Sequence, residues 1–295
     1  MIIYNACPCC NSENIVKALS AKDHTVSNEV FEIWHCNVCT ARFTQNVPGK
    51  NGIEKYYQSE DYISHSDTKK GFINSLYHRV RKRTLHSKRK NVEKFTKLST
   101  GTILDIGAGT GAFLSTMDKA GWNVTGIEPD EIARENAKKL YGLSLQTPQE
   151  LFNLPPQSFD AITMWHVLEH VHDLHNYIDQ FKKLLKPTGC LFVAVPNYTC
   201  YDEKVYKEFW AAYDVPRHLY HFSPRSITQL LLQHGLQLKD IKPMWYDSIY
   251  VSMLSEKYKS GKNNFLNAIW TGSVSNWRAL FNKETCSSLI YIVTH

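Results

Sequence analysis

The chain has 295 residues, of which 43% are hydrophobic, and a formal net charge of +6. This length accommodates one large catalytic domain and a smaller module, and the composition excludes the fibrous and intrinsically disordered classes. The first residues contain no basic segment followed by an apolar run, and no apolar run approaches the roughly 18 residues that span a bilayer. We therefore expect a cytoplasmic protein whose eight cysteines are reduced, which favours metal binding over disulfides.

Two matched cysteine pairs lie within the first forty residues. They are Cys7-x-x-Cys10 and Cys36-x-x-Cys39. Two such pairs supply the four thiolates of a closed, tetrahedral zinc site. The alternative is a set of unrelated buried thiols, and Cys9 competes with Cys10 as a ligand. We predict a structural zinc, because four protein ligands leave no open coordination position.

The residues around the pairs favour a zinc ribbon over residues 1–50. Pro8 pre-sets φ for a tight turn, and Asn11 tolerates the left-handed conformation after the first pair. Thr40 is less suited to the equivalent position after the second pair. Between the pairs, the segment EVFEIWHC partly alternates between polar and apolar residues, as a strand does.

Residues 51–98 are polar, aromatic and basic. Between Lys69 and Lys97 there are eleven Lys or Arg and one acid, Glu93. Apolar residues recur there at spacings near three, four or seven, beginning at Leu76, so we predict a linker of one or two amphipathic helices. A solvated helical face explains the charge. The alternatives are an anionic substrate, nucleic acid or a lipid surface.

A glycine-rich turn follows an apolar strand in the segment ILDIGAGTGAFL, which starts at residue 103. The strand ends at Asp105, and Gly107, Gly109 and Gly111 open a helix. Without side chains at these positions, backbone amides can approach a ligand at the helix N-terminus. The turn alone is ambiguous, since with Ala112 it also satisfies the Gly/Ala form of the dinucleotide-binding fingerprint.

The segments after this turn are more specific. A second strand, in WNVTGIEPD, ends on Glu128, where a carboxylate can accept both ribose hydroxyls of a nucleoside. In chain order, DIGAGTG, IEPD, LPPQSFDAI, LEHV and LLKPTGCLFVAVPN resemble the successive motifs of the class I S-adenosylmethionine (SAM)-dependent methyltransferases. The resemblance covers about residues 100 to 240 and resumes at SSLIYIVTH near the end of the chain.

This resemblance implies an α/β fold over residues 99–295: a Rossmann-like, seven-stranded mixed sheet with helices on both faces. It places Asp105 near the methionine amino end of SAM and Glu128 on the ribose. The residues expected to bind the cofactor are Asp105, Gly107, Ala108, Gly109, Gly111, Glu128, Pro129, Gln149, Glu150 and His166. A dehydrogenase is the alternative, but it lacks the downstream order of motifs.

The segment WHVLEHV contains His166-x-x-Glu169-His170, the spacing of the inverted zinc metalloproteases. Its position after the fourth motif strand implies instead that His166 borders the methionine part of SAM, while Glu169 and His170 begin a helix. We find no distant acid that would complete a protease site. Ubiquinone-type O-methyltransferases carry Glu-x-x-Glu-His here and bind a divalent cation with it; this chain departs from them at His166.

An aromatic loop over residues 196–222 follows the fifth motif strand. It precedes a helix with Ser223 as its N-cap and Gly235 at its end. We expect the loop to cover the methyl donor and to shape the acceptor pocket. His218 and His221 are the predicted general bases and Tyr213 a polar helper; the alternative for each His is a structural hydrogen bond.

A helical insertion is expected over residues 250–284, where large apolar residues alternate with Lys and Arg. Packing on the core is the favoured interpretation. The alternative is a membrane-surface or partner-binding role.

The predicted function is methyl transfer from SAM to a small-molecule acceptor, such as a nucleotide-linked sugar or another anionic metabolite. A zinc ribbon before such a domain is similar to the sugar C-methyltransferases, although their further C-terminal domain has no counterpart here. The rival functions are RNA methylation, with the ribbon and basic helices as the binding platform, and a non-catalytic SAM-binding or scaffold protein. The sequence defines neither the acceptor atom nor the oligomeric state.

Overall fold

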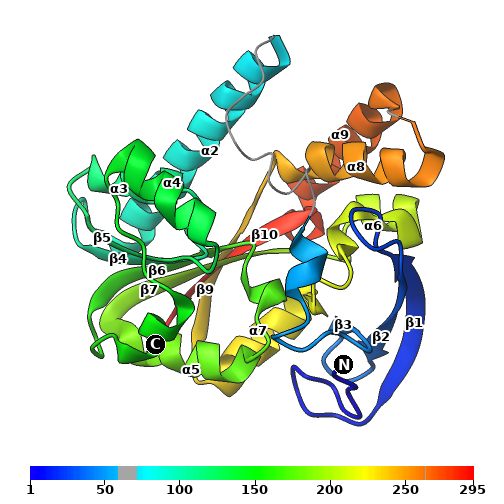
Figure 1. Cartoon of the computed structure of the whole chain (residues 1–295), viewed down its shortest axis with the longest axis horizontal. Helices are drawn as coiled ribbons and strands as arrows, with labels where there is room; N and C mark the ends of the chain where they lie inside the picture. Colours follow the sequence, from blue (N-terminus) through cyan, green and yellow to red (C-terminus); the bar gives the residue numbers. More distant parts are fainter. Residues whose placement is uncertain (59–71, 263) are drawn as a thin grey trace.

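The computed structural model describes residues 1–58, 72–262 and 264–295, except for the side chains of residues 72–79. Its larger sheet has six strands in the order β5-β4-β6-β7-β10-β9 (Figure 1). Four of them are parallel, and β10 runs antiparallel to both β7 and β9. The strands are β4 (Thr102–Ile106), β5 (Asn123–Ile127), β6 (Phe159–Trp165), β7 (Leu185–Pro196), β9 (Gln237–Pro243) and β10 (Ser288–Thr294).

The central strands are buried on both faces, and their alternate residues enter two different clusters. Leu104, Ile162 and Val193 pack with one cluster, which includes residues of α5 (Leu174–Leu184) and α7 (Pro224–Gln233). Ile103 and Phe192 face the other cluster, with residues of α2 (Phe72–Thr96) and α3 (Ala112–Asp118). The sheet is therefore covered by helices on both faces, as Rossmann-like folds require. The predicted fold class is confirmed.

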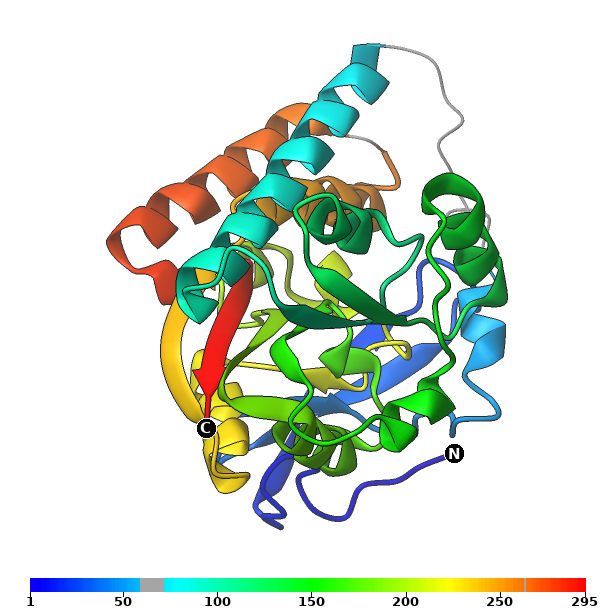
Figure 2. The same ribbon diagram turned by 90° about the vertical axis from the view of Figure 1, so that its left-hand side faces the viewer.

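The predicted number of strands is wrong, because six strands form in the described residues. The segment after α4 (Glu131–Tyr141) makes a single parallel bridge to β5, between Ile127 and Gln146. The short η2 helix (Pro148–Asn153) then begins, so the segment does not extend into a seventh strand. Figure 2 shows the opposite edge, where β9 lies beside β10 and the C-terminus.

The first fifty residues contribute a second, smaller sheet with the order β1-β2-β3-β8. Strands β1 (Ile15–Lys22), β2 (Val30–Cys36) and β3 (Arg42–Thr44) are antiparallel neighbours. The fourth strand, β8 (Tyr220–His221), comes from the loop predicted to cover the methyl donor and to shape the acceptor pocket. The ribbon and this loop thus share one backbone hydrogen-bonded sheet.

The loop between β7 and β8 is irregular but ordered by short helices: α6 (Tyr201–Tyr206), η4 (Lys207–Phe209) and η5 (Ala211–Tyr213). The predicted cap of α7 is confirmed, since the Ser223 hydroxyl accepts from the Ser226 amide and Pro224 is the first helical residue. The remaining short helices are η1 (Glu54–Tyr57), η3 (Leu168–His170) and η6 (Lys283–Thr285).

The predicted basic helix is α2, and it is not a free linker. Val92 is fully buried against the sheet, and Leu85 and Phe95 pack around it. Lys69 and the rest of segment 59–71 lie outside the described residues. Within the part of the chain that is described, no helix combines the length and apolar character needed to cross a membrane.

The predicted insertion is a pair of helices, α8 (Asp247–Ser260) and α9 (Phe265–Phe281). Packing on the core holds for α8, where Leu254 and Tyr258 are partly buried beside the aromatic loop. It is wrong for the large apolar residues of α9, which are exposed.

Candidate active site

The strand order reverses at β4, which has β5 on one side and β6 on the other. In open α/β sheets, ligands bind at such a switch point, beyond the carboxyl ends of the strands. The glycine-rich turn follows β4, and η3 follows β6. The two are in contact, because a Cβ atom at Gly107 would lie 2.4 Å from Cγ2 of Val167. Most of the predicted site residues therefore gather at this edge.

The glycine-rich turn is tied to the end of β5. The amides of Gly107 and Ala108 both donate to the carbonyl of Ile127, at 2.8 and 3.0 Å. Gly109 has a φ of +55°, and a Cβ there would meet no atom within 4 Å, so the turn borders open space on that side. Glu128 is 7% exposed and accepts from the Gly109 amide at 2.7 Å.

This arrangement fits a nucleoside ligand. One oxygen of Glu128 takes the Gly109 amide and the other takes the Asp130 amide at 3.0 Å. Each carboxylate oxygen has two acceptor positions, so both retain one for a ribose hydroxyl. Burial, the largest effect, raises the pKa of Glu128, and the two amide hydrogen bonds oppose it.

Asp105 lies at the end of β4 and is 1% exposed. The hydroxyl of Thr163 donates to it at 2.6 Å. Burial raises the pKa of Asp105 to about 7, while Thr163 and the charge of Lys88 act to lower it. Lys88, from α2, places its ammonium 4.3 Å from the ring centre of Trp165, and burial lowers its pKa to about 8. The pair offers one acidic and one basic group, which suits the amino acid end of SAM.

His166 is held between two carboxylates. Its Nε2 lies 3.0 Å from Asp247, the first residue of α8, and its Nδ1 lies 3.4 Å from Glu169. Burial by itself lowers the pKa of His166, but Asp247 and Glu169 outweigh it and raise that pKa to about 10. His166 is therefore a cation at neutral pH, and its backbone has a left-handed φ of +59° directly after β6.

Glu169, His170 and His218 form a compact cluster beside this imidazolium, with their donor atoms within 4.8 Å of one another. Glu169 is 0% exposed, and in the described residues no hydrogen bond of ordinary geometry reaches its carboxylate oxygens. The cluster is one of two groups there that could hold a metal ion; the other is the cysteine group. Burial, and next the charge of His218, lowers the pKa of His170 to about 4, so its imidazole is neutral.

The tautomer of His218 follows from its hydrogen bond. Its Nδ1 lies 2.8 Å from the carbonyl oxygen of Ala212, which can only accept, so Nδ1 carries the proton in the neutral ring. Its Nε2 then presents a lone pair. The ring packs edge-on against His170, with ring centres 4.6 Å apart. His218 has the form of a base.

His221 and Tyr213, the other predicted catalytic residues, lie together at the junction with the ribbon sheet. Thr44 donates its hydroxyl proton to the His218 carbonyl, so the Nε2 of His221, 3.0 Å from that hydroxyl, must donate to it. Burial lowers the pKa of His221 well below its usual value. The Tyr213 hydroxyl donates to Glu203 at 2.6 Å and accepts from Arg42 of β3. Their bonding favours a structural role.

The predicted adenine contacts are less enclosed. Gln149 and Glu150 are exposed on η2, beyond the end of β5, and Glu150 accepts from Asn153 at 3.3 Å. The Pro129 carbonyl accepts from Arg134. Thr163, Lys88 and Asp247 are not among the residues predicted from the sequence. Thr163 sits in the strand before WHVLEHV and could have been suspected, but Lys88 and Asp247 carry no local signal.

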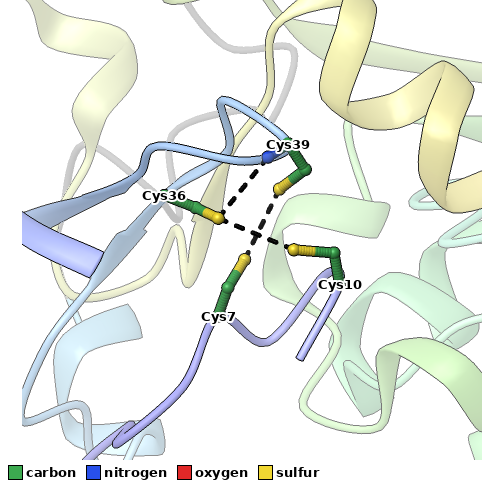
Figure 3. A group of neighbouring side chains, drawn as sticks. All are labelled: Cys7, Cys10, Cys36 and Cys39. Atoms are coloured by element: carbon green, nitrogen blue, oxygen red, sulfur yellow. Dashed lines mark hydrogen bonds between the residues drawn. The ribbon is translucent and has the colours of Figure 1, made fainter. Parts of the chain in front are cut away.

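The four predicted cysteine ligands meet at one end of the ribbon sheet (Figure 3). Sγ of Cys7 lies 3.5 Å from that of Cys39, and Sγ of Cys10 lies 3.6 Å from that of Cys36. A tetrahedral zinc with Zn–S bonds of 2.3 Å separates its sulfurs by about 3.8 Å, so the group fits this metal. Cys9 lies outside the group and donates its amide to Cys7 at 3.4 Å.

Both turns that carry the cysteines have the left-handed residue expected of them. Asn11 and Thr40 have φ values of +59° and +66°. Thr40 adopts this unfavourable conformation while anchored to the catalytic half of the chain: its hydroxyl pairs with that of Ser223 at 2.7 Å, and its carbonyl accepts from Tyr198 at 2.6 Å.

The mixed sheet, with a glycine-rich turn after β4 and a carboxylate after β5, is that of a Rossmann-like α/β protein. The sequence profile of the family described as "Methyltransferase domain" matches residues 77–240. The chain belongs to this family and is a SAM-dependent methyltransferase.

Its curated relatives include ubiquinone biosynthesis O-methyltransferases. The protein from Xanthomonas euvesicatoria is 30% identical over 167 residues, which cover 51% of this chain and 69% of that protein. The protein from Actinobacillus pleuropneumoniae is 41% identical over 109 residues, covering 33% of this chain and 46% of its own length. The similarity thus spans 46% to 69% of the length of these relatives.

Solved structures share the fold. A SAM-dependent methyltransferase from Archaeoglobus fulgidus superposes with a TM-score of 0.51 at 15% identity, covering 76% of this chain and all of that one. Magnesium protoporphyrin IX methyltransferase from Synechocystis superposes with a TM-score of 0.54 at 14% identity, covering 82% and 97%.

Proposed function

We propose that this protein transfers the methyl group of SAM to a hydroxyl oxygen of a small, anionic molecule. The observation that carries the proposal is the cluster of Glu169, His170 and His218, which borders the glycine-rich turn through Val167. A hydroxyl acceptor must lose its proton as the new bond forms, and the cluster contains imidazole side chains, the common proton acceptors of enzymes. The O-methyltransferase names of the relatives support an oxygen acceptor.

The residues that would hold SAM divide between its two ends. Glu128 would accept the ribose hydroxyls, and Asp105 and Lys88 would hold the ammonium and carboxylate of the methionine part. Gln149 and Glu150 remain the proposed adenine contacts. When bound, SAM supplies a methyl group that is already activated on a sulfonium, so the protein chiefly aligns the acceptor with it.

The proton has a defined destination in this proposal. Nε2 of His218 takes it from the acceptor hydroxyl, while the Ala212 carbonyl keeps the ring in place. The carboxylate of Glu169 stabilises the imidazolium that results, because the two groups lie close together away from water. His166 is already protonated, so its role is to fix Glu169 in place.

The ribbon's role in this proposal is structural. A zinc bound by Cys7, Cys10, Cys36 and Cys39 would hold β3 against β8 and so position the loop that carries His218. Thr44 of β3 donates directly to the His218 carbonyl at 2.7 Å. Zinc would thus support the acceptor site without touching the reacting atoms.

The test begins with labelled methyl transfer from SAM into fractionated host extract, separated into small molecules, RNA, protein and lipid. We expect the labelled methyl group in the small-molecule fraction, as a methyl ether of an anionic compound. Label confined to RNA would replace the proposal with the RNA function, and absence of transfer despite SAM binding would favour a non-catalytic protein.

Paired variants then test the proton acceptor. His218→Ala should retain SAM affinity and lose ~10²–10⁴-fold in rate, with partial recovery at raised pH as hydroxide replaces the base. His221→Ala is the matched control. It should lower the melting temperature and lose much less rate than His218→Ala. Added Mg²⁺ should leave the wild-type rate unchanged. A rate that depends on added Mg²⁺ would instead make Glu169, His170 and His218 metal ligands.

A further inference from the structure

Helix α9 packs on the protein through small residues. Its buried positions face α8 and α6, and a Cβ atom added at Gly272 would lie only 2.7 Å from the backbone of Ile249. The helix therefore approaches its neighbour too closely for large side chains. The buried residues are Ala268, Thr271, Gly272, Ser275 and Ala279.

The large apolar residues of α9 point the other way. Five of them, each 59–83% exposed, form what we call the α9 apolar face: Leu266, Trp270, Trp277, Leu280 and Phe281. At 100° per residue they span about 100° of the helix circumference, opposite the small residues. An ordinary surface helix buries its large apolar residues, so this helix has the inverse arrangement. Figures 1 and 2 show the α8–α9 pair on the outside of the molecule.

The chain around this face is uniformly basic. Residues 257–283 contain five Lys or Arg and no Asp or Glu. All five side chains are exposed: Lys257, Lys259, Lys262, Arg278 and Lys283. Lys283 pairs with Asp240 at 2.7 Å, and Lys242 pairs with the same carboxylate at 2.6 Å. Two cations thus share one carboxylate, so the three side chains together keep a net positive charge. The face is thus flanked in the sequence by exposed cations, which complement an anionic surface.

We propose that the α9 apolar face lies on an anionic lipid bilayer, with its Trp and Leu side chains at the level of the headgroups and the basic residues over lipid phosphates. A helix with exposed Trp, Phe and Leu on one side and cations around them is the pattern of interfacial binding. A second copy of this chain fits less well, because a two-fold contact would bring the same cations together. The proposal is independent of the proposed acceptor.

Vesicle flotation of the full-length protein tests this surface. Wild type should bind vesicles of phosphatidylcholine with 30% phosphatidylglycerol and bind pure phosphatidylcholine at least tenfold more weakly. The double variant Trp270→Gln/Trp277→Gln should lose at least tenfold in binding to the anionic vesicles. Lys259→Glu/Lys262→Glu should lose binding in the same way. Ile132→Gln, which removes a 63% exposed apolar residue of α4, should stay within twofold of wild type.

SAM affinity, measured by calorimetry, should be equal in all variants, which separates loss of the surface from loss of the fold. Wild type that remains unbound with anionic vesicles would overturn the proposal. So would Trp variants that bind as wild type does. A dimer in sedimentation equilibrium without lipid, dissolved by the Trp variants, would assign the face to a second copy instead.

Discussion

Replacing Arg217 by Met should destabilise the protein by about 3 kcal/mol. The guanidinium is 2% exposed and joins three parts of the chain. It donates to Asp23 of the ribbon at 3.1 Å, to the carbonyl of Tyr56 at 2.7 Å, and to Asp214 of the aromatic loop at 2.6 and 3.0 Å. Met keeps most of the aliphatic volume, so the change tests the charge.

The magnitude follows from the groups left behind. Breaking a buried ion pair costs about 3–5 kcal/mol, because the remaining charge is uncompensated. The Asp23 side chain is 0% exposed, but it also accepts from the amides and hydroxyls of Thr25 and Ser27 and from the Val26 amide. The Asp214 side chain is 24% exposed and can be solvated. We therefore expect a loss of stability near the lower end of this range, about 3 kcal/mol.

The pH dependence gives an independent check. Burial would raise the pKa of Asp23, but the Ser27 amide, the charge of Arg217 and the Thr25 amide together hold it well below its usual value. A lowered folded-state pKa contributes stability above the unfolded pKa of about 3.9, and this is lost as pH falls through the folded-state value. The difference between wild type and variant should be constant from about pH 7 to 5 and shrink below about pH 4.

Urea unfolding at several pH values measures these differences. The matched control is Lys17→Met, which removes an ion pair with Glu32 in which both side chains are exposed; its unfolding midpoint should not move. A loss smaller than about 1 kcal/mol at pH 7, or one that is the same at pH 3, would refute a role for the buried pair.

Four further substitutions probe the two candidate binding sites. Glu128→Ala should weaken SAM binding at least tenfold in calorimetry, since unpaired ribose hydroxyls cost about 1–3 kcal/mol; unchanged affinity would remove the ribose assignment. Gly107→Ala should abolish SAM binding and lower the melting temperature, because the added methyl group would collide with the neighbouring valine; full binding would contradict the packing of the turn. Elemental analysis should find about one zinc per chain, lost in Cys36→Ser and kept in Cys9→Ser; loss in both would make the ligand set wrong.

The sequence predicted those features whose cause is local. Two Cys-x-x-Cys pairs determine their own turns, and Asn11 takes the left-handed conformation expected there. The glycine-rich turn and Glu128 each follow a strand directly, so the order of motifs was enough to bring them to one sheet edge. The site roles of these residues stay predictions until the variants are made.

Other features depend on contacts between distant segments and have no local signal. Lys88 is one of eleven basic residues between Lys69 and Lys97, and only the packing of α2 selects it as the one near Asp105. Asp247 reaches His166 across 81 residues. The two residues of β8 are too short a strand for any periodicity to reveal, so the partnership of His221 with the ribbon was not predicted.

The pairing of β3 with β8 also bears on how the protein is made. His221 and Thr44 are 177 residues apart, so at about 5–20 residues per second the ribosome needs roughly 10–35 s to supply the partner strand. All four cysteines of the ribbon have been synthesised long before that, so zinc can close the ribbon turns while β3 still has an open edge. An open edge is a template for unwanted pairing between nascent chains. The edge is only three residues long, Arg42–Thr44, which keeps that hazard small until the aromatic loop emerges and covers it.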